Sequence, residues 1–574
     1  MTGGRLLLLG SLLLGAAAEP PPASPETAVA AGTPGVVRTI LTGDRIEEIP
    51  LRFLGVYRGA AGPGHDLYLV RLEGEEAERV GIAAGMSGSP VYVDGKVVGA
   101  LSYRMGALPK EPVAGVTPIE DLLGAARFSR PAAPAADENV VPIATPLLVG
   151  GMVPAVRDYL APALASYGII QQSGGAPVAG VSGGGTSAAV PAAPLQPGSA
   201  VAAALIRGDL EVAAVGTVAW VEGKGVFAFG HPFLGTGRVE MPMLRAEVVH
   251  TLAALGGSVK LSNLGAEIGS IVEDRLTGIV GTLGTRARML PIVLHVHGGD
   301  YPQKDFRFEV VRQSELTPVL TGAALANALF LNTGYDEQAT VRAHGTLRLR
   351  GLPDVALTGA YSSGGRLHPV LAAASEIQRT LELVYRNPFQ PPEVESVELA
   401  VEVVRERRRY GVDAVRYDRG TLRPGTTLTL RCALRSFRDQ PVERTLTLRV
   451  PEGVPAGAPL TLIVGSPDAV ARAEGRPIQE RLRNAVDLAG YVRALSGQGS
   501  ADTLTAALLW SAPGAVARGA RYDELPGTVA RLLASDAAGL GATPLDRGVL
   551  ARAEEEMDGP VEGSYTARLE VSAP

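Results

Sequence analysis

The sequence predicts a mainly β protein of three or four domains. Its 574 residues include 71 glycines and 43 prolines, whereas aromatic residues make up only 5%. Glycine and proline in these numbers favour short strands joined by tight turns over long helices. A chain of this length exceeds one ordinary domain, and a hydrophobic content of 46% is enough to fill large cores.

Charge and cysteine content limit the partners and the cross-links of the chain. The net charge of -6, from 53 basic and 59 acidic residues, gives no long-range attraction to phosphate backbones. Nucleic acid is therefore not expected as a partner. The only cysteine, Cys432, stands in a segment that alternates like a strand, and we expect a buried thiol rather than a nucleophile. The cores alone must hold the domains, because one cysteine forms no internal disulfide.

The first 18 residues have the pattern of a secretory signal peptide. Arg5 supplies a positive charge, Leu6–Leu14 is an apolar stretch, and small residues ending at Ala18 precede Glu19. This stretch is too short to span a bilayer, and no later apolar run is long enough to do so. We expect an exported protein, in the periplasm, the cell envelope or the extracellular space, without a stable membrane span after cleavage. Retention of the segment as an N-terminal anchor is the alternative.

Composition shifts and turn signals divide the rest of the chain. The first unit has strand-like segments at Glu47–Gly55, Asp66–Leu72, Pro90–Val93 and Lys96–Tyr103. A strand that runs into a short helix, Gly115–Leu123, comes last, and a Pro/Ala-rich linker follows. The expected units are the signal peptide 1–18, a Pro/Ala-rich leader 19–35, a serine-bearing half 36–128, the linker 129–139, a histidine-bearing half 140–299, a mixed α/β region 300–392, and a β-sandwich with a helical insertion 393–574.

The run Gly85-Met86-Ser87-Gly88-Ser89-Pro90 predicts a serine nucleophile at Ser87. A serine hydroxyl needs a base to remove its proton, and the acyl transition state needs N–H groups directed at the developing oxyanion. The glycines allow a sharp turn that points the N–H groups of Gly85 and Ser87 at one spot. We therefore expect Gly85 and Ser87 to form an oxyanion hole. A simple turn is the alternative for the hexapeptide alone.

The residues after the motif strengthen this prediction. Val91–Ser102 has the pattern of a strand, an Asp-Gly hairpin turn and a second strand. This order is similar to that of the trypsin-like peptidases, whose Gly-Asp-Ser-Gly-Gly-Pro also precedes a strand, a hairpin and a strand, and whose last strand runs into a C-terminal helix. Gly115–Leu123 fills that last place. The resemblance implies that Ser87 belongs to one half of a two-barrel peptidase.

His231 is the predicted base among the seven histidines of the chain. It follows an apolar strand at the start of a turn, so its ring projects from a rigid edge into a cleft; a histidine that caps a turn is the alternative. His65 lies in a polar turn, where we expect an exposed ring. His295 and His297 share one face of a strand with Asp300 near, but a third clear ligand is missing, so we expect no metal site.

Several short segments carry a resemblance to a known family. They are Gly81–Pro90, Gly95–Ala100, Pro197–Val201, Phe229–His231, Ile268–Ile271 and Gly278–Gly281. On these residues the chain resembles the SpoIVB-type serine peptidases, named for a bacterial sporulation signalling protease, over about residues 40–290. The resemblance implies that Ser87 is the nucleophile and His231 the base. The rest of the chain lies outside it.

The order of the two halves departs from the family. There the histidine half comes first, whereas here Ser87 precedes His231, as in a circular permutation of the trypsin-like order. A permuted chain should carry its acid after the histidine. Asp274, on a strand-like segment, is the predicted orienting carboxylate. Glu240 and Glu73 are weaker candidates, and an exposed turn aspartate is the alternative for Asp274.

The sequence thus favours a secreted serine endopeptidase that cleaves proteins or peptides, the chain itself included, without a cofactor or metal. Its expected fold is mainly β, with two trypsin-like β-barrel halves in permuted order, a mixed α/β region and a C-terminal Ig-like sandwich. One alternative is a catalytically silent scaffold with the same fold. Another is an envelope binding or adhesion protein that uses the sandwich. The pattern carries no signal for the oligomeric state.

Overall fold

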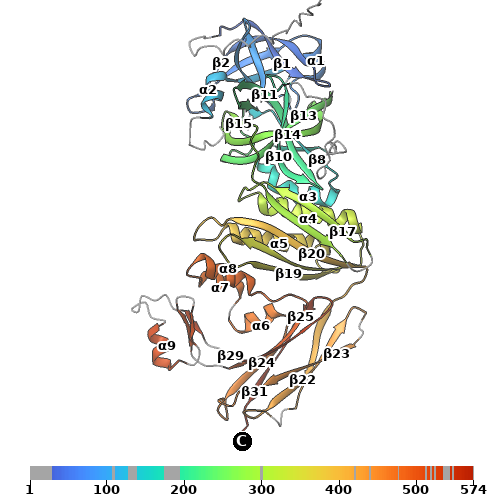
Figure 1. Cartoon of the computed structure of the whole chain (residues 1–574), viewed down its shortest axis with the longest axis vertical. Helices are drawn as coiled ribbons and strands as arrows, with labels where there is room; N and C mark the ends of the chain where they lie inside the picture. Colours follow the sequence, from blue (N-terminus) through green and yellow to red (C-terminus); the bar gives the residue numbers. More distant parts are fainter. Residues whose placement is uncertain are drawn as a thin grey trace, which may run out of the picture.

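The computed structural model arranges the chain as a series of units along one long axis (Figure 1). The strands nearest the N-terminus lie at one end, and the orange and red C-terminal sheets lie at the other. The expected signal peptide and most of the Pro/Ala-rich linker fall outside the described residues. The structure describes residues 29–106, 110–126, 139–167, 169–172, 194–297, 301–418, 422–438, 441–475, 477–510, 514–517, 520–522, 525–533, 543–545 and 548–572.

Six antiparallel strands of the first unit close into a ring, which we call the first ring. Its strands are β1 (Pro34–Ile40), β2 (Ile46–Gly62), β3 (His65–Leu72), β4 (Ser89–Val93), β5 (Lys96–Met105) and β6 (Val113–Pro118). They pair in the order β4-β1-β2-β3-β6-β5, and β5 pairs back with β4. Helix α1 (Glu75–Val80) precedes β4, and helix α2 (Ile119–Gly124) follows β6 directly. The predicted strands of this unit and its strand-to-helix ending are confirmed.

A second ring of six antiparallel strands follows. Its strands are β10 (Ala200–Gly208), β11 (Glu211–Glu222), β12 (Gly225–Ala228), β13 (Gly237–Leu252), β14 (Val259–Arg275) and β15 (Gly278–Leu283). They pair in the order β10-β13-β14-β15-β12-β11, and β11 pairs back with β10. The two rings share an apolar cluster, in which Val97 and Ile119 of the first unit meet Trp220 and Phe227 of the second. The rings therefore pack directly against one another.

The connection between the rings joins both of them. Strand β7 (Val140–Pro142) pairs with β5 of the first ring, and β8 (Thr145–Gly150) pairs with β11 of the second. Strand β9 (Ile169–Gln172) adds to β8, and helix α3 (Pro154–Leu164) with the short turn η1 (Ala165–Tyr167) lies between them in the chain. The segment Val140–Pro146 thus crosses from one ring to the other.

Beyond the second ring the same sheet continues into a helix-covered layer. Its strands are β16 (Leu290–Val296), β17 (Lys304–Val310), β18 (Thr340–Leu349), β19 (Val355–Ser362) and β20 (Val394–Val404), and its helices are α4 (Thr317–Thr333) and α5 (Pro369–Tyr385). β20, which we expected to begin the sandwich, pairs instead with β16 and β18. Period-two alternation indicates a strand but not its partner, which explains this difference.

Two four-stranded sheets of the C-terminal part share one apolar core. They are β23-β22-β21-β30 and β29-β25-β24-β31. Cys432 is buried in this core, as expected for a structural thiol. The elements are β21 (Tyr410–Arg416), β22 (Thr427–Ser436), β23 (Pro441–Arg449), β24 (Pro459–Gly465), α6 (Pro467–Ala473), α7 (Ile478–Arg483), α8 (Leu488–Ser496), β25 (Thr503–Trp510), β26 (Gly514–Ala517), β27 (Ala520–Tyr522), α9 (Gly527–Leu533), β28 (Thr543–Leu545), β29 (Gly548–Glu556), β30 (Val561–Glu562) and β31 (Ser564–Glu570).

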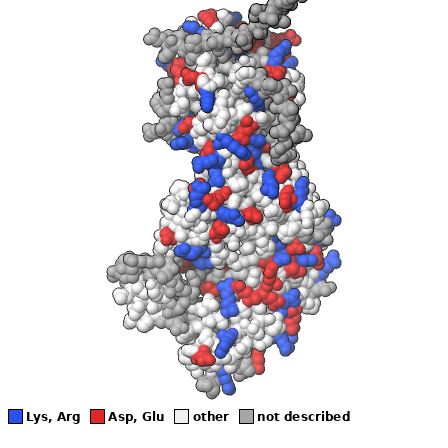
Figure 2. Space-filling model, in the orientation of Figure 1, with Lys and Arg blue, Asp and Glu red and all other residues white. Residues whose placement is uncertain are grey.

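The prediction of a mainly β protein is confirmed, because strands dominate every described unit. Among the described residues, no helix has both the length and the apolar character needed to cross a bilayer. On the face drawn in Figure 2, basic and acidic side chains are interspersed, in keeping with the small net charge.

Candidate functional site

The Ser87 turn lies between α1 and β4 and is held between the two rings. Gly85 and Gly88 have φ values of 90° and 92°, a backbone region that glycine adopts without strain. A Cβ atom on Gly88 would lie 2.0 Å from the carbonyl oxygen of Thr217, so only glycine fits this close approach. The N–H of Thr217, on β11, donates to the carbonyl oxygen of Ser87 at 2.8 Å. The motif glycines therefore let the turn dock against the second ring.

The His231 turn follows β12 and is held against the first ring. A Cβ atom on Gly230 would lie 2.2 Å from the hydroxyl oxygen of Ser102, on β5. Thr117, on β6, donates its hydroxyl to the carbonyl oxygen of Gly230 at 2.7 Å. The N–H of Phe229 donates to the Thr217 carbonyl at 3.2 Å, which links this turn to the residue that holds Ser87. The structure thus brings the Ser87 turn and the His231 turn together at Thr217, between the rings.

Both side chains are buried and both have a free polar atom. Ser87 is 0% exposed and His231 is 2% exposed. Nδ1 of His231 lies 2.8 Å from the carbonyl oxygen of Pro232, and since a carbonyl only accepts, the ring proton belongs on Nδ1. Within the described part of the chain, neither His231 Nε2 nor Ser87 Oγ has a hydrogen-bond partner, so the two are not bonded to each other. With the proton on Nδ1, the lone pair of the ring is on Nε2, and the backbone of Ile143 lies near the ring.

Burial also determines the charge of His231. It lowers the pKa of the ring to about 4, and the nearby backbone of Pro232 and Ile143 opposes this shift only in part. The imidazole is therefore neutral at physiological pH. A neutral ring with its proton on Nδ1 can accept a proton at Nε2, which is the state that a general base requires.

The pKa of His231 predicts how the stability of the fold depends on pH. The unfolded chain takes up a proton below about pH 6.5, whereas the folded chain does so only near pH 4, so folding stability is lost as the pH falls through this window. At pH 5 the expected loss from His231 alone is about 2 kcal/mol relative to pH 7.5, and the raised pKa of Asp274 offsets part of this loss in the whole protein. Urea unfolding of the wild type and of His231→Gln at both pH values measures it. An equal pH dependence in the two proteins would contradict this expectation.

Asp274 does not contact the His231 ring, contrary to its expected role. Its buried carboxylate accepts the backbone N–H groups of Phe233, Leu234 and Gly235 at 2.7 to 3.0 Å. Burial raises the pKa of Asp274 to about 6, and these N–H groups lower it in part. Three N–H groups of one tight turn converge on the carboxylate, whereas the Nδ1 proton of His231 finds a carbonyl within its own turn. Asp274 therefore holds the loop that follows His231.

The other candidates from the sequence have partners of their own. The weaker acid candidates form ion pairs, Glu240 with Arg288 and Glu73 with Arg52. The half-buried ring of His65 bonds to Asp121 at 3.1 Å. None of these contacts involves Ser87 or His231.

The first histidine of the considered metal pair also has a partner. His295 Nδ1 bonds to Asp305 at 2.8 Å. Asp300, the carboxylate considered near His295 and His297, lies outside the described residues.

The connecting segment covers the Ser87 turn. The N–H of Gly85, one of the two predicted oxyanion donors, donates to the carbonyl oxygen of Ala144 at 3.3 Å. In the described structure the N–H of Ser87 has no backbone acceptor. The N–H of Ile143 donates to the carbonyl oxygen of Ser102 at 2.8 Å, and the Ile143 side chain is buried in the core of the first ring. This segment therefore lies along β5 and contacts the Ser87 turn.

Sequence reasoning missed Lys260, a buried lysine beside the same turn. It lies on β14 and is 1% exposed. Its Nζ donates to Thr39 Oγ1 at 2.7 Å and to Thr217 Oγ1 at 3.3 Å. Period-two alternation could have indicated its burial, because Lys260, Ser262 and Leu264 occupy alternate positions and point to the same, buried face of the strand.

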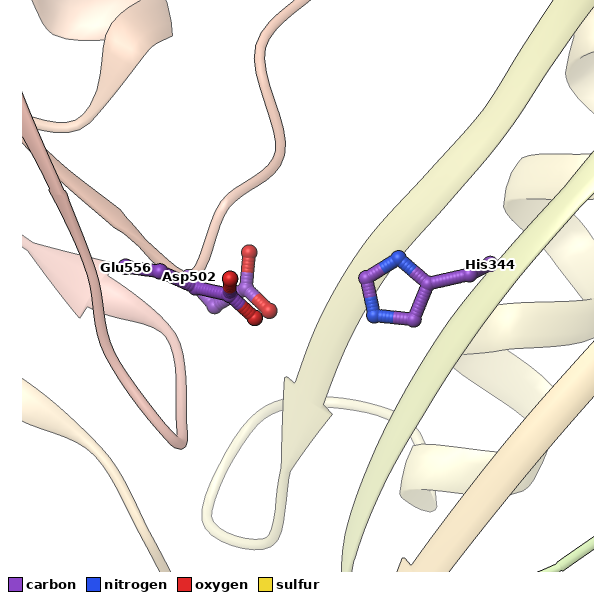
Figure 3. Close-up of side chains that lie close together, drawn as sticks. All are labelled: His344, Asp502 and Glu556. Atoms are coloured by element: carbon purple, nitrogen blue, oxygen red, sulfur yellow. The ribbon is translucent and has the colours of Figure 1, made fainter.

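A separate cluster of three side chains could be taken for a metal site. His344 of β18 faces Asp502 and Glu556 of the C-terminal part (Figure 3), and their ligand atoms lie within 4.8 Å of one another. The guanidinium of Arg342 already pairs with both carboxylates, with Nε 3.3 Å from Asp502. Arg342 therefore offsets part of this negative charge, and its ion pairs tie the C-terminal part to the helix-covered layer.

No family model, curated protein or solved structure matches the chain.

Proposed function

We propose that the protein is a serine endopeptidase whose nucleophile is Ser87 and whose base is His231. One observation carries this proposal: a serine hydroxyl and an imidazole Nε2, both buried and both without a partner among the described residues, belong to two turns that contact the same residue, Thr217, between the rings. Buried polar atoms are ordinarily hydrogen-bonded, so a free pair of this chemistry indicates a functional site. Nε2 would accept the Ser87 proton, and the N–H groups of Ser87 and Gly85 would stabilise the oxyanion.

The arrangement of the rings supports the same class of enzyme. Two closed rings of six antiparallel strands, with the site between them, match the two-barrel design of trypsin-like peptidases. The serine turn before a hairpin and the strand that runs into α2 match its serine half. On this proposal the chain is a permuted member of the SpoIVB-type peptidases. The two C-terminal sheets would then be an Ig-like accessory module.

The proposed site differs from a full triad in how its histidine is oriented. The acid of a triad accepts a hydrogen bond from the Nδ1–H group of the histidine and stabilises the imidazolium that forms. Here the carbonyl of Pro232 accepts this hydrogen bond, and Asp274 instead accepts backbone N–H groups of the turn that follows His231. A carbonyl fixes the tautomer but carries no full charge, so it stabilises the imidazolium less than a carboxylate does. We therefore propose a serine–histidine pair with modest intrinsic activity.

The proposed enzyme is self-blocked in the state described. Val140–Pro142 pairs with β5 as an added strand, and Ala144 places its carbonyl oxygen on the Gly85 N–H. Extended peptides commonly bind proteins by adding a strand to a sheet edge, and this segment uses the edge in that way. A substrate peptide would have to displace it. On this proposal the segment contributes to the burial of Ser87, and activity requires that the segment opens.

Labelling with a fluorophosphonate tests the proposal. The probe forms a phosphorus–oxygen bond with an activated serine and releases fluoride. We expect one label per chain on the peptide that contains Ser87, located by mass spectrometry, and no label on Ser87→Ala. A label on another serine, or equal labelling of Ser87→Ala, would rule out this site.

The complete burial of both side chains also favours one other function, a silent scaffold that keeps the peptidase fold. The two differ in one measurable respect. A scaffold stays unlabelled even when Val140–Ala144 is displaced, whereas the enzyme gains reactivity. Displacement can be achieved by replacing these five residues with a Gly-Ser-Gly-Ser-Gly sequence.

A further inference from the structure

Lys260 is a buried amine whose described partners are hydroxyl groups. Its side chain is 1% exposed, and no described carboxylate forms an ion pair with it. Burial alone lowers the pKa of Lys260 to about 7. Lysine is almost never fully buried without a charged partner, because removing its charge from water costs several kcal/mol. The hydrogen bonds of Lys260 therefore indicate what the buried amine does.

The first branch of these hydrogen bonds leads to the start of the Ser87 turn. Nζ of Lys260 donates to Thr217 Oγ1 at 3.3 Å, and the Thr217 hydroxyl donates to the carbonyl oxygen of Gly85 at 2.9 Å. The backbone N–H of the same threonine donates to the carbonyl oxygen of Ser87 at 2.8 Å. One residue of β11 therefore holds the turn at two points and is itself held by the amine.

The second branch leads to the end of the same turn. Nζ of Lys260 donates to Thr39 Oγ1, on β1, at 2.7 Å. The hydroxyl of Ser89 lies between Thr39 Oγ1, at 3.0 Å, and the carbonyl oxygen of Met86, at 2.6 Å. The amine thus reaches both sides of Ser87, through Gly85 before it and Ser89 after it.

The stem and the backbone of Lys260 contact the turn as well. A Cβ atom on Gly85 would lie 3.3 Å from both Cβ and Cδ of Lys260, so the stem packs directly against that glycine. The N–H of Lys260 donates to the carbonyl oxygen of Ala84 at 3.0 Å, and Ala84 donates to Ser258 at 2.8 Å. The end of β14 next to Ser258 therefore runs alongside the chain that enters the turn.

From these contacts we propose that Lys260 is a positioning residue, which holds the backbone of the Ser87 turn so that the Ser87 hydroxyl and N–H point toward the His231 side. It touches no reacting atom in this role and acts through Thr217, Thr39 and Ser89. The effect on reactivity rests on the proposed function, whereas the effect on the order of the turn does not. This separation allows the two to be tested independently.

The test compares Lys260→Met with Lys224→Met, a matched change at an exposed position of the second ring. Methionine keeps the apolar length of the side chain but cannot donate a hydrogen bond. We expect amide hydrogens of Ala84–Gly88 to exchange at least about tenfold faster in Lys260→Met, read by mass spectrometry, while the rest of the first ring is unchanged. The fluorophosphonate labelling rate should fall about tenfold or more. The melting temperature should not fall, because a buried amine is replaced by an apolar group.

A pair of threonine variants keeps the proposal testable if Lys260→Met fails to fold. Thr217→Ser retains the hydroxyl that joins the amine to Gly85, and it should exchange and label as the wild type does. Thr217→Val removes that hydroxyl at equal size, and it should reproduce the faster exchange and slower labelling.

Three results would overturn the proposal. The first is wild-type exchange of Ala84–Gly88 in folded Lys260→Met. The second is faster exchange spread evenly over the first ring with a lower melting temperature, which indicates a purely structural role. The third is loss of labelling in Lys260→Met while His231→Ala still labels, which makes Lys260 the base itself. If the wild type takes no label at all, the proposed function fails, and the exchange of the turn still decides the role of Lys260.

Discussion

His231→Ala is expected to slow the labelling of Ser87 by about a thousandfold. A positioned general base contributes about 10²- to 10⁴-fold to reactions of this kind. The ring of His231 donates its Nδ1 proton to the carbonyl of Pro232, and its Nε2 has no hydrogen-bond partner among the described atoms, which suits it to act as the base. Labelling rates of the wild type and the variant, measured at pH 7.5 with equal probe concentration, give the ratio directly.

The control for this prediction is Asp274→Asn. Asp274 accepts hydrogen bonds from the backbone of Phe233–Gly235 and forms none with the His231 ring. We expect it to lower the melting temperature, since an amide replaces one acceptor oxygen by a donor, and to slow labelling less than His231→Ala does. His65→Ala, at the Asp121 contact, should label as the wild type. A loss in Asp274→Asn as large as that in His231→Ala would mean that the carboxylate reaches the ring during reaction.

The local features of the site could be predicted from the sequence because they depend on neighbouring residues. The Ser87 motif, the Asp-Gly hairpin after it and the strand-to-helix ending all follow from turn chemistry and periodicity within a few residues. The apolar strand before His231 is equally local. These signals predicted the two turns that the structure places against Thr217.

The long-range features could not be predicted in the same way. Asp274 stands where a permuted chain should carry its acid, but three N–H groups of the Phe233–Gly235 turn compete for its carboxylate and hold it. The role of Lys260 depends on Thr39 and Thr217, which belong to strands far from it in the sequence. β20 alternates like a sandwich strand, yet its partner strands were set by the tertiary fold.

Locking the connecting segment onto β5 should abolish most of the reactivity of Ser87. Met105 and Val140 are direct partners in the antiparallel pair of β5 and β7. The bonds from Ile143 to Ser102 and from Gly106 to Asn139 make this a non-hydrogen-bonded pair, in which Cα atoms lie about 4.5 Å apart. That spacing suits a disulfide in Met105→Cys/Val140→Cys. The one native thiol, Cys432, is buried in a different core and should not interfere.

The disulfide form of the Met105→Cys/Val140→Cys variant should be labelled at Ser87 about 30- to 1,000-fold more slowly than its reduced form. A disulfide typically stabilises the state in which it forms by about 2–4 kcal/mol, and the population of the opened state falls in proportion. Reduction should restore the wild-type rate. The single variant Met105→Cys, oxidised in the same way, controls for the loss of the methionine.

A peptide-binding measurement tests whether β7 blocks the edge of β5, independently of whether Ser87 reacts. A fluorescent peptide with the sequence of residues 139–146 should bind the reduced double variant and not the oxidised one, read by anisotropy. If the peptide binds only the reduced protein but neither form is labelled, β7 covers a peptide-binding edge of β5, and the proposed enzymatic activity is wrong. Equal labelling and equal peptide binding in both redox states would show that β7 does not block Ser87, and burial of the serine would then need another cause.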